Sequence, residues 1–425
     1  MRAFSEWSSR MITVLRLASF LALRQVRRGS LWTNLLITSV MALTFLNLIF
    51  IGGILVGLIE SASLANRSLY TGDVLISAKQ TRPYIEDSPG AIQLARSLPW
   101  VEALSARYTG IADVEAGYQA KTNYTDIPNE TNALVAGINP DDEDAVSGLR
   151  SKIIEGSYLG AGDSEAILIG SDKLYQYSPI DTPGLRTLKG VAVGDKVRLK
   201  IGPHVKEFMV KGIVKGKVQE IDSRVFMLDT SLRELLGRAD KSVNEIAITT
   251  MSDEGALFTK EALVRSGLAD RARVQTWIDA QPKFIRDIKD TFALLGNIVG
   301  TIGLIVSSIT IFIVIFINAV TRRKYIGILR GIGVDASVIE LSYVMQALFY
   351  ATVGTFVGAL ILFLIVKPWI DAHPINFPFS DGVLSATAMG TSIRGALLIF
   401  ASLVAGYVPA RMIVKQNTLD AILGR

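Results

Sequence analysis

Cysteine is absent from the 425 residues, and only two histidines occur, His204 and His373. A chain without cysteine has no disulfide bond, no thiolate metal ligand and no cysteine nucleophile. Two histidines far apart in the sequence also argue against a histidine-rich metal centre. The sequence therefore predicts no metal site, and it is compatible with an oxidising compartment that is managed without disulfide bonds.

The motifs of nucleotide binding and hydrolysis are missing as well. Gly212–Lys217 has the glycine and lysine content of a phosphate-binding loop but the wrong spacing, and it lies among strand-like segments. Neither a Gly-x-Ser-x-Gly elbow nor a His-Glu-x-x-His pair occurs. We therefore expect no catalytic residue, no bound cofactor and no enzymatic activity in this chain. Energised work would require a separate chain that binds ATP.

Charged residues are scarce in four long stretches. Half of the chain is hydrophobic and 20% is charged, a mixture that predicts a few membrane helices and one large aqueous domain. We expect spans at 35–59, within 283–321, at 341–366 and at 383–409, each long enough to cross a hydrocarbon core of about 30 Å. The last contains Arg394, which would either snorkel to the interface or face the helix bundle as an intramembrane polar site.

The basic residues that border these spans predict the topology. They are Arg24, Arg27 and Arg28 before the first span, Arg322, Arg323, Lys324 and Arg330 after the second, and Arg411 and Lys415 after the fourth. By the positive-inside rule, both termini are cytoplasmic and the large domain lies outside the cell membrane. The first span is too long for a cleaved signal peptide, so we expect an uncleaved anchor.

The two cytoplasmic ends and the outer loop are short. The first, 1–34, contains an amphipathic basic helix at 8–28, which either lies on an anionic leaflet or docks a partner, or is only a positive flank of the first span. Residues 367–382 form the extracytoplasmic loop between the last two spans, and 410–425 form the cytoplasmic tail.

Residues 60–282 alternate short strand-like runs with turns and helical pieces, which predicts an α+β domain. Dense strands and glycines at about 160–230 predict a small β-rich subdomain inserted into it. The acidic run 141–144 invites a metal site, but Asn139 and Pro140 before it are typical of a helix start, which we prefer.

The helix at 283–321 exceeds the length that a membrane requires, which favours a stalk that continues outside; a tilted helix with a frayed end is the alternative. It ends at Arg322, Arg323 and Lys324, a predicted anchor at the cytoplasmic interface. Residues 322–340 are then expected to lie as a short amphipathic segment against that face.

Within this segment, Tyr325–Gly333 resembles the cytoplasmic coupling segment of FtsX-type ABC transporter permeases, a stretch of the form I-[AG]-I-L-[KR]-[AG]-[LIM]-G. The end of the chain is similar to the closing motif of that family, although Thr418-Leu419-Asp420 lacks the usual Asp-Pro. The order of one span, a large domain and three spans also matches. In the domain, Gly137–Glu143 and Gln219–Arg224 resemble permeases of the lipoprotein-releasing type, whereas Val193–Leu199 is shared with the core domain of macrolide and peptide exporters.

The resemblance implies mechanotransmission. A cytoplasmic ABC ATPase dimer would grip the coupling segment, and its closure on ATP would move the extracytoplasmic domains of two permease copies, or of this chain and a paralogue. The residues implied in coupling are Ile326, Leu329, Arg330, Ile332, Gly333 and Val334.

The cargo implied is a lipoprotein or another amphiphile, and the remaining partners are membrane lipids; no nucleic acid is expected. Two alternatives stay open: a signalling scaffold that activates an envelope partner such as a cell-wall hydrolase, and a permease for peptide or macrolide efflux.

Overall fold

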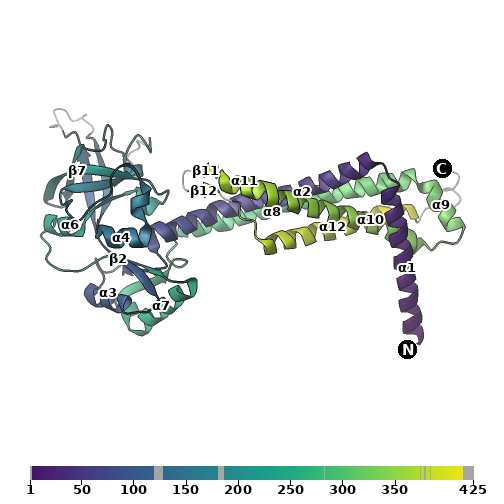
Figure 1. Cartoon of the computed structure of the whole chain (residues 1–425), viewed down its shortest axis with the longest axis horizontal. Coiled ribbons are helices and arrows are strands. Elements are labelled where there is room, and N and C mark those ends of the chain that lie inside the picture. Colours follow the sequence, from purple (N-terminus) through teal and green to yellow (C-terminus); the bar gives the residue numbers. More distant parts are fainter. Residues whose placement is uncertain are drawn as a thin grey trace. The chain divides into compact units, whose positions relative to one another are not determined.

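A computed structural model describes residues 2–118, 128–179, 186–281, 283–373, 375–377, 380–382 and 384–414 (Figure 1). The chain divides into two compact units. One comprises Met1–Leu58, Asp287–Ile375 and Gly382–Arg425, and the other comprises Ile59–Arg286 with Asn376–Asp381. The first is a bundle of helices and the second contains the large sheet. This agrees with the predicted class, an α-helical membrane protein with a large α+β domain.

Helices make up the bundle almost entirely (Figure 1). They are α1 (Arg2–Arg27), α2 (Leu31–Asn66), α8 (Lys283–Thr321), α9 (Arg323–Gly331), α10 (Ala336–Ile361), α11 (Lys367–Ala372) and α12 (Ala388–Val414). Four helices in the described part of the chain are long and apolar enough to cross a membrane, and they contain α2, α8, α10 and α12. A short hairpin of β11 (Ile375–Phe377) and β12 (Ser380–Gly382) follows α11.

The helix ends differ from the predicted spans. α2 continues seven residues beyond 59, to Asn66. α10 begins at Ala336 instead of 341, because the Asp335 side chain accepts a hydrogen bond from the Ser337 backbone N–H at 3.0 Å and caps the helix. α12 begins at Ala388 instead of 383 and continues through Pro409 to Val414. Residues 336–340 therefore belong to α10 and not to the amphipathic segment before it.

Small residues bring α10 and α2 into close contact. A Cβ atom built on Gly354 would lie 2.3 Å from the Cβ of Met41, and one on Gly358 would lie 2.7 Å from Cδ1 of Phe45. The spacing of these glycines is the small-xxx-small pattern by which membrane helices approach each other closely. Apolar residues of α2, α8, α9, α10 and α12 form one core around this contact.

The second unit is built on a ten-stranded mixed sheet with the order β10-β1-β9-β2-β3-β8-β5-β7-β4, and β6 pairs with β2 and β7. The strands are β1 (Val74–Ala78), β2 (Val101–Ala116), β3 (Glu130–Ile138), β4 (Ile153–Gly156), β5 (Ala166–Gly170), β6 (Lys196–Ile201), β7 (His204–Val214), β8 (Arg224–Leu228), β9 (Glu245–Thr250) and β10 (Ala272–Thr276). The helices are α3 (Ser88–Arg96), α4 (Pro140–Ser147), α5 (Gln219–Asp222), α6 (Asp229–Leu235) and α7 (Asp253–Arg265).

The 16-residue strand β2 joins two parts of this sheet. Its first half pairs with β9 and its second half with β3 and β6. Separate apolar cores lie beside the two halves. The predicted β-rich region at about 160–230 supplies β5 to β8, but these strands share their sheet with β2 and β3, so the β-rich part extends beyond that range.

The acidic run begins a helix, as predicted. The Asn139 side chain accepts hydrogen bonds from the backbone N–H groups of Asp141 and Asp142, and Pro140 occupies the first position of α4. One acid of the run, Glu143, is fully buried and belongs to a charged cluster described below.

Candidate functional site

The predicted coupling segment folds as the short amphipathic helix α9, followed by a tight turn. The turn at Gly333 has φ +93°, a conformation that favours glycine, and the Val334 N–H donates to the Leu329 carbonyl at 3.0 Å. Asp335 then starts α10. Gly333 thus has a geometric reason: it turns the chain between two helices.

Only part of the predicted apolar set is available to a partner. Ile332 is 73% exposed, but Ile326 is 4% exposed and lies in the core of the bundle. Leu329 and Val334 pack against that core. Ile326 therefore faces the bundle, and the role of the predicted residues in ATPase coupling stays a prediction.

Two residues that sequence reasoning missed lie on the outer face of α9. Tyr325 is 70% exposed and Ile328 is 51% exposed. With Ile332 they recur at i, i+3 and i+7, the spacing of one helix face. This period was present in the sequence, but the same segment also places Ile326 and Leu329 at i and i+3, and periodicity alone does not tell which face is buried. We call Tyr325, Ile328 and Ile332 the α9 stripe.

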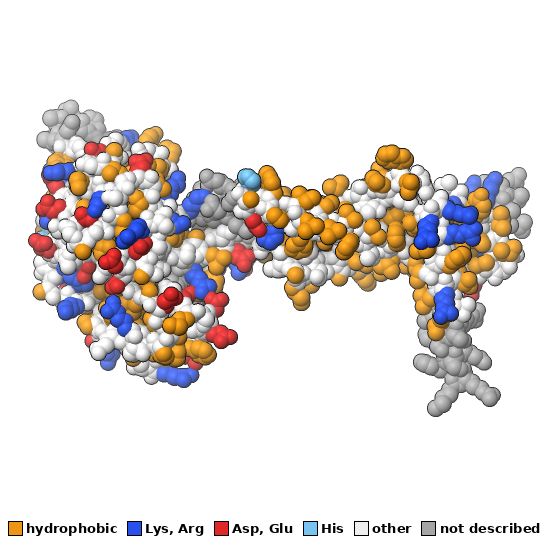
Figure 2. Space-filling view, viewed as in Figure 1, with side chains coloured by type: hydrophobic (Ala, Val, Ile, Leu, Met, Phe, Trp, Pro, Cys, Tyr) orange, Lys and Arg blue, Asp and Glu red, His pale blue; other side chains and the backbone are white. Residues whose placement is uncertain are grey.

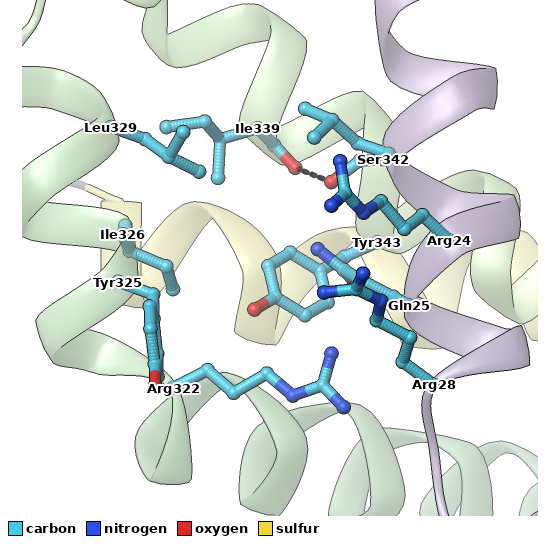
Figure 3. Close-up of a pocket in the computed structure, with 11 residues that line it drawn as sticks. Arg24, Gln25, Arg28, Arg322, Tyr325, Ile326, Leu329, Ile339, Ser342 and Tyr343 are labelled. Atoms are coloured by element: carbon cyan, nitrogen blue, oxygen red, sulfur yellow. Dashed lines mark hydrogen bonds between the residues drawn. The ribbon is translucent and has the colours of Figure 1, made fainter.

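The basic residues around α9 have different surroundings. Figure 2 shows Lys and Arg side chains gathered at the end of the bundle where α9 lies. Lys324 is exposed and Arg323 is half-buried. Arg330 donates from Nη1 to the Val414 carbonyl at 2.7 Å, so it ties α9 to the last turn of α12. Arg322 is half-buried and lines a cavity between helices (Figure 3).

Arg394 lies in the second turn of α12 and is half-buried. A Cβ atom built on Gly52 of α2 would lie 3.1 Å from Nη2 of Arg394. The guanidinium group therefore lies against the bare backbone of α2, on the bundle side of α12. A functional role for Arg394 inside the membrane stays a prediction.

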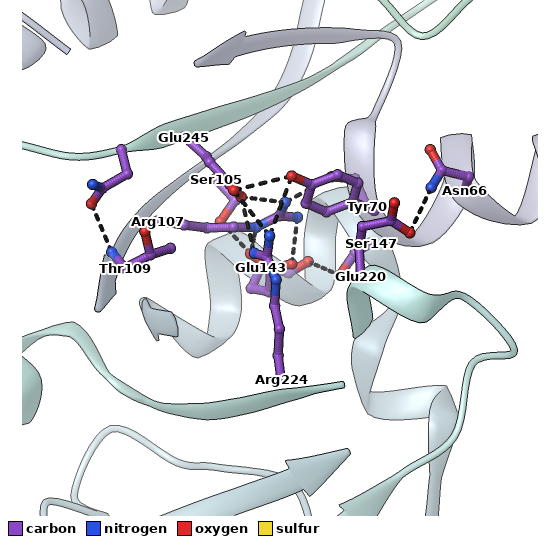
Figure 4. Close-up of polar contacts among 11 residues, drawn as sticks. Asn66, Tyr70, Ser105, Arg107, Thr109, Glu143, Ser147, Glu220, Arg224 and Glu245 are labelled. Atoms are coloured by element: carbon purple, nitrogen blue, oxygen red, sulfur yellow. Dashed lines mark hydrogen bonds and ion pairs between the residues drawn. The ribbon is translucent and has the colours of Figure 1, made fainter. Parts of the chain in front are cut away.

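In the second unit, polar contacts fix the residues that follow the first span. The C-terminal end of α2 continues into a π-helical turn, Arg67–Thr71. The Asn66 amide donates to Glu220 at 3.1 Å, and Arg67 forms ion pairs with Asp73 and Asp253. The Tyr70 hydroxyl donates to Glu245 of β9 at 3.0 Å (Figure 4).

Tyr70 contacts a buried cluster of charged residues. The Arg107 guanidinium on β2 donates to both carboxylate oxygens of Glu143 at 2.8 and 2.7 Å, and the Arg107 and Glu143 side chains are both 0% exposed (Figure 4). Arg107 also donates to the Tyr70 carbonyl at 2.7 Å. Arg224 of β8 forms a two-point ion pair with Glu245 at 2.9 and 3.0 Å. We call this cluster, together with the contacts of residues 66–73, the polar clamp.

Electrostatics favour the charged forms in the polar clamp. Burial alone would raise the pKa of the Glu143 carboxyl, but the charge and hydrogen bonds of Arg107 outweigh this and lower the pKa below its usual value. Glu245 behaves in the same way: burial opposes ionisation, and Arg224 with Arg107 lowers its pKa. Sequence reasoning missed the clamp because its charges come from α4, β2, β8 and β9, and only the tertiary fold brings them together.

These features define a class: a membrane protein with four candidate spanning helices, an amphipathic helix between the second and third, and an α+β domain between the first and second. Residues 297–418 match the family described as FtsX-like permease C-terminal. The chain therefore carries an FtsX-like permease domain, and its relatives are ABC transporter permeases of the MacB and LolC types.

Three relatives illustrate the similarity. An uncharacterized ABC transporter permease of Methanocaldococcus jannaschii is 24% identical over 64% of this chain and 65% of its own length. The macrolide export ATP-binding/permease protein MacB of Campylobacter jejuni is 21% identical over 78% of this chain and 49% of its own length. The lipoprotein-releasing system transmembrane protein LolC of Neisseria meningitidis is 24% identical over 64% of this chain and 70% of its own length. The chain thus spans about half the length of the MacB relative.

Among solved structures, the periplasmic region of MacB from Actinobacillus actinomycetemcomitans aligns with 50% of this chain and 92% of its own length, at 12% identity and a TM-score of 0.35.

Proposed function

We propose that this chain is the permease subunit of an ABC transporter that works by mechanotransmission. A separate cytoplasmic ATPase dimer binds ATP and grips α9, and two permease copies, or this chain and a paralogue, form the membrane part. In this proposal the termini lie in the cytoplasm and the α+β domain lies outside, as the positive-inside rule predicts.

The α9 stripe is the observation that carries this proposal. Two aliphatic side chains and a tyrosine stay exposed on a helix whose opposite face is anchored in the bundle core through Ile326. A short helix held in this way presents its outer side chains in fixed positions, which suits docking into an apolar groove of a partner. Its tie to α12 through Arg330 would carry a movement of α9 into a second helix.

Helix length and the polar clamp support transmission of movement. α8 has 39 residues and α2 has 36, so each is longer than a bilayer core requires. The polar clamp joins the residues after α2 to strands β2, β8 and β9, because the Tyr70 hydroxyl and carbonyl form hydrogen bonds with the charged side chains of Glu245, Arg224 and Arg107. A displacement of α2 would therefore be transmitted to the sheet through ordered contacts and not through a flexible linker.

For the substrate we propose an amphiphile such as a lipoprotein, handled on the outer side. Among the described residues, the spanning helices share a large apolar core, and the polar side chains buried in them, such as Ser307, Gln346 and Ser402, are few and uncharged, which is poorly suited to an aqueous channel. The names of two relatives refer to macrolide export and to lipoprotein release. The size of the exported domain favours substrate handling over the scaffold alternative.

The test is co-purification in mild detergent with co-expressed candidate ATPases. Ile328→Asp with Ile332→Asp should abolish association of the ATPase. Neither isoleucine lies in the bundle core, so the substitutions should not disturb the fold, but they place two negative charges on the α9 stripe. Ile111→Asp with Met251→Asp changes two residues that are 72% and 70% exposed in the α+β domain, and should leave association unchanged. If no ATPase associates with the wild type, or if the α9 variant retains it, the proposal is wrong.

Transport is separated from the scaffold function by photo-crosslinking from the α+β domain. A lipid-anchored cargo that crosslinks in an ATP-dependent manner supports the transporter. A crosslinked hydrolase without cargo supports the scaffold.

A further inference from the structure

The cavity beside Arg322 has features that the coupling proposal does not use. Its volume is about 380 Å³, and it lies between α1, the α8–α9 junction and α10. A volume of this order holds a small ligand or the head of a larger one. The residues that line it are Leu21, Arg24, Gln25, Arg28, Arg322, Tyr325, Ile326, Leu329, Ile339, Ser342 and Tyr343.

Positive charge gathers on one side of the cavity and apolar groups on the other. Figure 3 shows the side chains of Arg24 and Arg28, from the α1 side, and of Arg322 reaching toward one another. Ile326 and Leu329 lie across the cavity from Arg24 and Arg28 (Figure 3). Among the described residues, the lining contains three arginines and no aspartate or glutamate.

These arginines lack an acidic partner among the described residues. Within the described part of the chain, no ion pair involves Arg24, Arg28 or Arg322. The side-chain oxygen of Gln25, which also lines the cavity, is buried and has no hydrogen-bond partner there. Three guanidinium groups beside an unused acceptor match an anion that carries a hydroxyl or amine donor close to its charge.

The surroundings of the cavity point to lipid. α1 exposes Ile12, Leu15, Leu17, Phe20 and Leu23. Together with its arginines, this is the composition of a helix that lies in a membrane interface. A soluble anion would gain nothing from the apolar wall, whereas an amphiphile would bury its first carbons against it.

We infer that this cavity binds the headgroup of one anionic phospholipid, from the leaflet at the basic end of the bundle. The phosphate lies between Arg24, Arg28 and Arg322, a headgroup hydroxyl donates to the Gln25 oxygen, and the acyl chains leave along the exposed apolar surface. The lipid would thereby link α1 to the α8–α9 junction, so that the position of α9 depends on lipid composition. This inference does not depend on the identity of the ATPase or of the cargo.

The experiment uses the purified full chain in detergent. It is titrated with dioctanoyl phosphatidylglycerol, and binding is followed by calorimetry and by native mass spectrometry. We expect one saturable site per chain for this lipid and none for dioctanoyl phosphatidylcholine or inorganic phosphate. Each basic residue near an anionic lipid contributes about fivefold in affinity, so Arg24→Gln with Arg28→Gln should weaken binding roughly 30-fold.

Arg16→Gln with Arg27→Gln is the matched control. Both residues are exposed on α1 and outside the cavity, and the variant removes the same charge. It should stay within about twofold of the wild type. Equal losses in the two variants, or an unchanged affinity in the cavity variant, would overturn the site. Two other results would also overturn the inference. If inorganic phosphate binds as tightly as the lipid, the cavity is a site for soluble anions. If the cavity variant loses ATPase association but binds lipid as the wild type does, the arginines belong to a surface that contacts an acidic partner.

Discussion

Replacing Glu143 by glutamine should destabilise the α+β domain more than other single charge changes on its surface. The carboxylate accepts hydrogen bonds from Nε and Nη2 of Arg107 and from the Ser105 hydroxyl, at 2.7–2.8 Å, and none of these three residues is exposed. Glutamine keeps one oxygen, but its NH₂ group faces a guanidinium donor, and Arg107 loses its bidentate counter-charge. Removing one partner of a buried ion pair costs about 3–5 kcal/mol in the free energy of unfolding.

In a domain of this size, that cost lowers the unfolding temperature by roughly 6–20 °C. The measurement is thermal unfolding of the purified full chain in detergent, with hydrogen exchange of β2 peptides to assign the transition to the domain. Glu261→Gln is the control: Glu261 pairs with Arg265 and their side chains are 59% and 79% exposed, so the change should cost less than about 1 kcal/mol.

The reasoning is refuted if Glu143→Gln and Glu261→Gln unfold at the same temperature. A second variant tests its electrostatic basis. Arg107→Met combined with Glu143→Met removes both charges, so it should be less destabilised than the sum of the two single changes, because neither charge is left buried alone.

Three further predictions concern other parts of the chain. Gly354→Leu should separate α10 from α2, because the leucine side chain would overlap Met41. The yield of folded protein in detergent should therefore fall. Leu364→Ala changes an exposed side chain of the same span and should leave the yield unchanged. Arg330→Gln should loosen α9 from α12, seen as a broader spin-label distance distribution between them; an unchanged distribution would contradict the role of its bond to Val414. Burial raises the pKa of Asp222 to about 6, although the backbone N–H groups of Gly216 and Lys217 partly oppose this. The folded state then holds the extra proton between about pH 4 and pH 6, so the free energy of unfolding should fall as pH rises through that window, and Asp222→Asn should flatten the dependence.

The sequence was sufficient for features that depend on local composition. Uncharged length located the four membrane helices, and Asn139-Pro140 located the start of α4. The predicted helix ends were less accurate, because a helix can extend beyond the hydrocarbon core of the membrane. Asp335 begins α10 early through its side-chain cap, and Ala388 begins α12 late, after a non-helical stretch that periodicity alone does not reveal.

Features that depend on pairing between distant segments could not be read from the sequence. Ile326 and Ile328 look equivalent in an alternating apolar segment, yet one is buried and the other is exposed. Glu143 looked like an ordinary first-turn acid until α4 packed beside β2 and Arg107. In both cases the outcome is decided by which neighbours the fold supplies, and a single sequence does not contain that information in any local pattern.

Pro409 makes α12 easier to bend near its C-terminal end. Proline has no N–H, so the Ala405 carbonyl receives no helical hydrogen bond and the helix bends most easily at that turn. Beyond it lies one short turn that ends at Val414, whose carbonyl is held by Arg330. We expect residues 410–414 to follow α9 by bending at Pro409, with faster backbone hydrogen exchange at 410–414 than at 398–404. A small displacement of α9 would then move this last turn first, and the stiffness of the helix at Pro409 would set how much of the movement reaches the rest of α12.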